Sequence, residues 1–427
     1  MDAAAATGGA SRAAPRGLAL VALGAAALAF LLHGAHLLTL ARAQGCPSAL
    51  LLCPTEVGPW AAGDYRSYWR VAERIREGGP LGASYLRRGP GYPLLLLLAA
   101  ELTGQVSPAR WLGPLGAGLA AGAVSWLAGA LSGRLRGALL AALLFGLWLD
   151  AWRFSAALRP DGLHAFLAAA ALAASVGWRR SERARAGLLA AVLWAAAQAL
   201  RPTFAALPLI LPALLFKRGA GRRYRRVSLG LWLASLAVPA FTIGANRIQH
   251  GIAIPSQVLA VNLACYAVPR LEEESGRGTF LALRRQCVER FRGLAPAERV
   301  RAQLRYAREA LLARPGAALR SFLRELRVQT LHPLRLWDVE ARRALYPAWG
   351  ETGSLPVLAF WLLGAAGLFA LARSEPGLAL FLALAFLLVM LPATTSHLAG
   401  SRLRFPLDLL FLPVVASLLA RGRAASG

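Results

Sequence analysis

The sequence has a single lysine, Lys217, and few acidic residues, with 21 Asp and Glu against 48 Lys and Arg and a formal net charge of +27. It also lacks the short motifs of nucleotide and metal chemistry. There is no Walker A loop, no GxGxxG turn after a strand, no HExxH element and no close cluster of His, Cys and Asp. These absences weigh against ATP, a nucleotide-activated donor and a structural zinc site. We therefore predict no cofactor and no metal site, and the sequence does not indicate a divalent cation.

Hydrophobic residues make up 57% of the 427 residues, and the mean hydropathy is +0.49. Such a composition is typical of a membrane protein. About 20 apolar residues are needed for a helix to cross roughly 30 Å of hydrocarbon. We predict an all-α polytopic membrane protein with about ten transmembrane helices, the first of them an uncleaved signal anchor. The predicted spans are 17–40, 111–131, 137–152, 161–178, 186–200, 203–216, 227–244, 355–371, 377–391 and 405–419.

Basic residues in the short loops predict the orientation, because short loops rich in arginine stay in the cytoplasm. With the N-terminus inside, the cytoplasmic loops hold most of these residues. Both termini are then cytoplasmic, in the inner membrane. The arginines are dispersed between apolar runs without an RNA-binding signature, which favours membrane lipids as partners and no nucleic acid. The cytoplasmic set is Arg12, Arg16, Arg134, Arg136, Arg179, Arg180, Arg183, Arg185, Lys217, Arg218, Arg222, Arg223, Arg225, Arg226, Arg373, Arg421 and Arg423.

Two long segments fall outside in this topology and divide the chain into three parts. Residues 1–244 form an N-terminal transmembrane module, whose first outer loop, 41–110, is predicted to contain juxtamembrane helices because its apolar run at 92–102 is too short to cross. Residues 245–354 form a helical outer loop of about 110 residues, long enough to escape the charge rule. Residues 355–427 contain the C-terminal transmembrane helices.

The four cysteines support this topology. Cys46 and Cys53 lie in the first outer segment, and Cys265 and Cys287 lie in the second. Four cysteines permit three pairings, and an oxidising compartment would allow one bond within each segment or leave the thiols free. The second segment also predicts an amphipathic helix at the membrane interface. Its apolar stripe follows Pro315, with arginines off the stripe. The stripe consists of Leu319, Phe322, Leu323 and Leu326.

The first outer segment carries an acidic residue at helical spacing from an aromatic one. Asp64, Tyr68 and Ala72 fall four apart and share one face of a predicted short helix, with Asp64 in its first turn. A carboxylate there suits the helix dipole, so a capped surface helix explains the pattern as well as a functional site does.

The order of motifs along the chain resembles that of the C-type (GT-C) membrane glycosyltransferases, which include the protein O-mannosyltransferases and the lipid A aminoarabinose transferase. The resemblance rests on the Asp64-xxx-Tyr68 pattern, which is followed by a glycine pair and by RGPGYP from Arg88. It continues with RPD at 159–161, RP at 201–202 and SRLRFP at 401–406. It covers most of the predicted membrane region in order.

The resemblance implies transfer of a sugar, with inversion, from a polyprenyl-phosphate donor to a glycan, lipid or protein acceptor outside the cytoplasm. Asp64 would be the general base, Asp161 would orient donor or acceptor, and Tyr68 and Tyr92 would support the site. A phosphate leaves as an anion, so the reaction needs positive charge rather than an acid. The implied donor-phosphate residues, headed by Arg201 and Arg404, are Arg87, Arg88, Arg159, Arg201, Arg402 and Arg404.

Other interpretations of these residues stay open. Each arginine near a span end can reach lipid headgroups instead, Asp161 can cap a helix, and Asp150 ranks below Asp161 as a functional acid. His33 and His36 are expected to pack on a neighbouring helix. The rival functions are a transporter or flippase for lipid-linked sugars, an O-antigen polymerase or ligase, and a scaffold subunit without activity.

Overall fold

The computed structural model describes residues 14–43, 64–79, 90–201, 206–217, 219–331, 354–394 and 401–421. All regular elements in these ranges are helices, which confirms the all-α prediction. In chain order they are α1 (Ala14–Ala43), α2 (Asp64–Arg76), α4 (Gly91–Thr103), η2 (Ser107–Trp111), α5 (Leu112–Ser132), α6 (Leu135–Leu147), α7 (Leu149–Ala156), α8 (Pro160–Ser181), α9 (Ala184–Leu200), α10 (Leu207–Leu215), α11 (Arg222–His250), α12 (Val258–Asn262), η4 (Leu263–Ala267), α13 (Val268–Glu274), α14 (Phe280–Arg290), α15 (Pro296–Leu312), α16 (Pro315–Leu331), α18 (Ser354–Ser374), α19 (Pro376–Thr394) and α20 (Ser401–Arg421).

Five of the described helical stretches are long and apolar enough to cross a membrane. They are Arg16–Arg42, Pro108–Ser132, Pro160–Ser181, Arg222–His250 and Pro356–Ser374. Helices α6 and α7 make a sixth if the pair, bent by 60°, is one broken span. Helices α4 and α9 and part of α19 are apolar but shorter. These spans are consistent with a multi-pass membrane protein, and the predicted count of about ten is not confirmed.

Helix α5 lies in the middle of the bundle and packs against α1, α6, α8 and α20. Its small residues permit the close approach that helices use inside membranes. A Cβ atom on Gly118, for example, would lie 2.8 Å from the carbonyl oxygen of Ala26 in α1. Large apolar side chains such as Leu20 and Leu31 of α1 remain exposed on the outside of the bundle, as expected for helices that face lipid.

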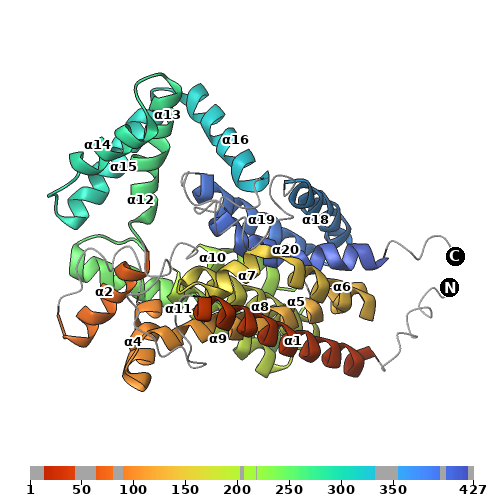
Figure 1. Cartoon of the computed structure of the whole chain (residues 1–427). Coiled ribbons are helices and arrows are strands. Elements are labelled where there is room, and N and C mark those ends of the chain that lie inside the picture. The colour runs from red at the N-terminus through yellow and green to blue at the C-terminus, as the bar shows by residue number, and fades with distance from the viewer. Residues whose placement is uncertain are drawn as a thin grey trace.

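Short basic connections gather at the end of the bundle where α1 begins and α20 ends (Figure 1). Arg134, between α5 and α6, donates a hydrogen bond of 3.0 Å to the carbonyl of Ala420. Arg180, at the end of α8, forms an ion pair of 3.0 Å with Glu375, between α18 and α19. Connections that the charge rule predicts to be cytoplasmic thus lie side by side in the fold.

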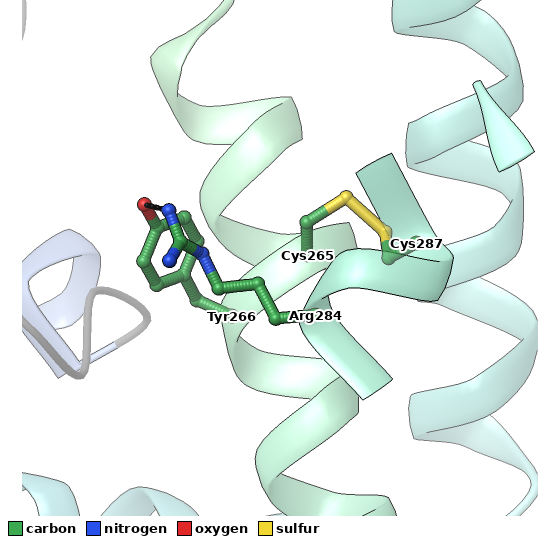
Figure 2. The surroundings of a disulfide bond; sticks show 4 residues. All are labelled: Cys265, Tyr266, Arg284 and Cys287. Atoms are coloured by element: carbon green, nitrogen blue, oxygen red, sulfur yellow. Dashed lines mark hydrogen bonds between the residues drawn. A yellow bond between two sulfur atoms is a disulfide. The ribbon is translucent and has the colours of Figure 1, made fainter. Parts of the chain in front are cut away.

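Helices α2, α4 and α12 to α15 of the two outer segments lie toward the other end, and α16 runs from them back to α18 and α19 (Figure 1). In the second of these segments a disulfide bond joins Cys265 of η4 to Cys287 of α14, with 5.4 Å between their Cα atoms, which confirms that pairing. Beside it, Arg284 lies over the ring of Tyr266 and donates a hydrogen bond of 2.9 Å to its hydroxyl (Figure 2). Cys46 and Cys53 lie outside the described residues.

Helix α16 corresponds to the amphipathic helix that the sequence predicts in the second outer segment. Leu319 and Leu323 are 58% and 52% exposed. The opposite face is polar and buried, with Ser321, Glu325 and Gln329 spaced by one helical turn each. The other two residues of the stripe, Phe322 and Leu326, are half-buried, and Leu326 packs against the main core. The exposed side of α16 thus combines leucines with Arg320, Arg324 and Arg327, a composition that suits a membrane interface.

Candidate functional site

Two centres of buried charge lie away from the basic end of the bundle. The first centre lies where the start of α8 meets the end of α9. These two ends are neighbours because α8 and α9 are antiparallel and are connected at their other ends by a tight turn at Glu182. Asp161 in the first turn of α8 forms an ion pair with Arg201, the residue that follows α9, and the Asp161 side chain is fully buried. The ion pair brings the RPD motif at 159–161 into contact with the RP motif at 201–202, although Asp161 and Arg201 are 40 positions apart in the sequence.

A glycine lets the first centre pack tightly on the preceding helix. A Cβ atom on Gly162, the neighbour of Asp161, would lie 2.5 Å from the carbonyl oxygen of Phe154 in α7. Arg159, two residues before Asp161, is the N-cap residue of α8 and is half-buried. A buried ion pair requires good geometry and further hydrogen bonds to offset the loss of solvation, so this pair constrains how α7, α8 and α9 meet.

The first outer segment docks next to this centre. Tyr68 of α2 and Tyr92 of α4 meet edge to face with 5.1 Å between ring centroids, and both are buried. They share an apolar cluster with Leu158, just before α8, and Leu200, at the end of α9. A Cβ atom on Gly91 would lie 2.5 Å from the backbone carbonyl carbon of Ala199, so only glycine permits this approach of α4 to α9.

Asp64, the predicted base, is the first residue of α2 and lies one helical turn before Tyr68. The backbone of the predicted catalytic helix is thereby brought toward the Arg201 and Asp161 pair. The side chain of Asp64 lies outside the described part of the structure, as do the side chain of Arg402 and the whole of Arg87 and Arg88.

The second centre surrounds Arg404, which is 1% exposed at the start of α20. Its Nε donates hydrogen bonds of 3.0 and 3.2 Å to the two carboxylate oxygens of Asp408, one turn later on α20. Its Nη2 lies 3.6 Å from Oδ2 of Asp150, the acidic residue in the first turn of α7. The indole of Trp148 donates a hydrogen bond of 3.2 Å to Asp408. One guanidinium therefore faces two buried carboxylates.

Arg404 also binds the last turn of α16 in the second outer segment. Its Nη1 donates hydrogen bonds of 3.0 and 3.3 Å to the carbonyl oxygens of Gln329 and Thr330 in the last turn of α16. Cations favour the C-terminal carbonyls of a helix, which are unsatisfied by the helix itself. Arg404 thus fastens the outer helical segment to the membrane bundle.

An aromatic contact connects the two centres. Phe154, whose carbonyl touches Gly162 beside the first centre, packs on Phe405 with 4.9 Å between ring centroids. Phe405 directly follows Arg404 of the second centre. The two ionic groups are therefore linked through one buried aromatic contact.

Sequence reasoning identified Arg201, Asp161, Arg404 and Asp150 but did not pair them. It missed several residues of both centres, although Asp408 could have been found, since it follows Arg404 by four positions in an otherwise apolar predicted span. The missed residues are Trp148, His164, Gln198 and Asp408.

The two histidines of α1 pack on α7, as expected from the sequence. His33 stacks on Trp152 at 4.4 Å between centroids, His36 meets the same ring edge to face, and Nδ1 of His33 lies 2.7 Å from the hydroxyl of Ser155. Among the residues that the structure describes, no three His, Cys, Asp or Glu side chains come together in a way that could hold a metal ion.

Comparison of the chain with protein-family models and with curated proteins finds no match.

Proposed function

We propose that the protein is a glycosyltransferase that moves a sugar from a polyprenyl-phosphate donor to an acceptor on the extracytoplasmic face of the inner membrane. The observation that carries this proposal is the buried Arg201 and Asp161 pair, next to which α4 and the helix that begins at Asp64 are docked. The three motifs to which the proposal assigns a base, a phosphate-binding cation and a second acid thus have their described backbone at one end of the bundle, which supports the proposal.

We propose that both termini are cytoplasmic and that the chain crosses the membrane about ten times. Arg134 bonds to the last turn of α20, Arg180 pairs with the connection between α18 and α19, and Lys217 pairs with Glu182 next to the end of α8. This grouping of basic connections supports the orientation, because such connections are retained in the cytoplasm. The Cys265 and Cys287 bond at the other end supports an oxidising compartment there.

In the proposed reaction the acceptor hydroxyl oxygen attacks the anomeric carbon of the donor sugar. Its proton passes to the Asp64 carboxylate as the new glycosidic bond forms. The bond between the anomeric carbon and the phosphate oxygen breaks, and its electron pair leaves with the polyprenyl phosphate. Arg201 stabilises the phosphate charge, which such contacts do more strongly in a water-poor site than in bulk water. Asp161 holds the Arg201 guanidinium in position.

Arg404 is less suited to the phosphate role than Arg201. Arg404 with Asp150 and Asp408 has a formal charge of −1 when all three are ionised, which opposes the entry of an anion. Arg201 and Asp161 together are neutral. We therefore propose that Arg404 positions α16, while Arg201 binds the donor. Arg87, Arg88, Arg159 and Arg402 remain candidates for further phosphate contacts.

A transporter usually places its polar groups near the bilayer midplane, on broken helices. In this chain Asp161 and Arg404 lie in the first turn of their helices and Arg201 directly follows its helix. Charges at helix ends favour chemistry at one membrane surface over passage through the bilayer.

The test is Asp64→Asn in the full-length protein, purified into nanodiscs. Transfer of labelled sugar from undecaprenyl-phosphate hexoses to envelope glycans of a deletion strain should fall about 10²- to 10⁴-fold, the usual contribution of a general base. Asn cannot accept the proton, yet it begins a helix as well as Asp, so folding and donor binding should persist.

The matched control is Glu77→Gln, which makes the same acid-to-amide change at an exposed position just after α2 and should leave transfer unchanged. A wild-type rate for Asp64→Asn, with donor binding confirmed, would refute the mechanism.

A further inference from the structure

A buried glutamine lies one turn from the proposed phosphate-binding arginine. Gln198 of α9 is 1% exposed, and neither Oε1 nor Nε2 of its side chain has a hydrogen-bond partner within the described residues. It lies in the last turn of α9 and precedes Arg201, the C-cap residue of that helix, by three positions. The face of α9 that carries Gln198 meets α8, because Trp194, four residues earlier, donates a hydrogen bond of 3.1 Å to Ser175 of α8.

An amide buried without partners is costly, since it loses its bonds to water and gains none in the protein. A leucine would fill similar space on this apolar interface without that cost. Most buried polar side chains in folded proteins are satisfied, so an exception calls for a ligand or another specific explanation. The position beside Arg201 favours a ligand.

His164 provides a second polar group at the same level. Its Nδ1 lies 2.8 Å from the carbonyl oxygen of Ala197, the neighbour of Gln198. A carbonyl only accepts, so Nδ1 carries the hydrogen and, in the neutral ring, Nε2 is an acceptor. His164 and Asp161 are three residues apart on α8, and both are fully buried. The α8–α9 end therefore holds donors and acceptors next to a cation.

We propose that Gln198 forms a subsite for a hydroxyl group of the donor sugar, adjoining the phosphate at Arg201, with His164 as a polar neighbour across the α8–α9 interface; this rests on the proposed function. A sugar hydroxyl both donates and accepts a hydrogen bond, and the Gln198 amide has the matching acceptor and donor. The chemistry of Gln198 beside Arg201 thus fits a polyhydroxylated ring attached to a phosphate, with the ring lying against α8 and α9.

The test compares binding of undecaprenyl phosphate with binding of undecaprenyl phosphate glucose and mannose to the full chain in nanodiscs. Gln198→Leu should weaken binding of a recognised sugar-bearing lipid about tenfold, the effect of losing one to two hydrogen bonds, and leave binding of undecaprenyl phosphate unchanged. Thermal stability should not fall, because the side chain that is removed has no hydrogen-bond partner within the described part of the chain. Gln198→Met, which is also apolar and more flexible, is measured in parallel in case leucine does not fit.

The matched control is Gln303→Leu on α15, another glutamine buried to 4% exposure whose Oε1 has no partner within the described residues. It should change neither affinity. The subsite would be overturned, and the proposed function spared, if Gln198→Leu weakened binding of undecaprenyl phosphate as much as binding of the sugar-bearing lipids. The same holds if it changed the affinity for none of them. Wild-type protein that binds none of the three lipids would overturn both proposals.

Discussion

Replacement of Arg404 tests the interpretation of the second centre most directly. The Arg404→Leu change removes the cation from between Asp150 and Asp408 and leaves two buried carboxylates facing each other. It also removes the two hydrogen bonds to the last turn of α16. We expect a large loss of stability and loosening of the outer helical segment, rather than a selective loss of donor affinity.

The magnitude follows from the geometry. At an effective dielectric constant of about 20, charges separated by about 3 to 3.6 Å attract each other by about 5 kcal/mol. Much of this attraction offsets desolvation, and breaking a buried ion pair by removing one partner costs about 3–5 kcal/mol. Total stabilities are typically about 5–15 kcal/mol, so the Arg404→Leu protein should be marginal.

Replacing either carboxylate should lower the stability less than Arg404→Leu does, and the two replacements should differ in size. Asp408→Asn removes the partner at 3.0 Å and weakens the bond to Trp148, but leaves Arg404 paired with Asp150. Asp150→Asn removes only the partner at 3.6 Å and brings the formal charge of the centre to zero. The expected order of destabilisation is therefore Arg404→Leu, then Asp408→Asn, then Asp150→Asn.

The assay is thermal unfolding of the purified variants in detergent, with steric trapping in bicelles for the free energies. Arg373→Leu, an exposed arginine at the end of α18, is the control and should lie within about 0.5 kcal/mol of wild type. An Arg404→Leu protein with wild-type stability and a weakened affinity for undecaprenyl phosphate would refute this reasoning and return Arg404 to the donor site.

Two further predictions concern the membrane orientation and the disulfide. Reporter fusions at Arg183 and Arg222 should report the cytoplasm, because Arg183 lies in the basic connection between α8 and α9 and Arg222 is the first residue of α11, which begins with basic residues. A fusion at Gly276, within the loop that the disulfide closes, should report the outer compartment, and a cytoplasmic signal there would reverse the topology. Replacing both Cys265 and Cys287 by Ser should lower stability by about 3 kcal/mol for this loop, whose ends are 22 residues apart, and a reductant should destabilise the wild type but not the variant. Equal effects of the reductant on both proteins would contradict the assignment.

Local patterns were sufficient for the helices. The apolar runs of 17–40 and 355–371 became α1 and α18, and the stripe after Pro315 became α16, because hydrophobic length and helical period belong to a single segment. The number of transmembrane spans was harder to predict from the sequence than the helices themselves. Helices such as α10 and α9 are short, and α6 and α7 are bent, so length alone does not assign each apolar run to one crossing.

By itself the sequence determined that the chain is helical, that its helices suit a membrane, and that its basic residues concentrate in short connections, since each of these properties depends only on neighbouring residues. The tertiary structure alone decided which charges meet. Whether Arg404 faces Asp150, 254 positions away, or whether Gln198 lacks a partner depends on which helices lie side by side. Burial removes water as a competing partner, so the same arginine or glutamine has a different role at each place in the fold.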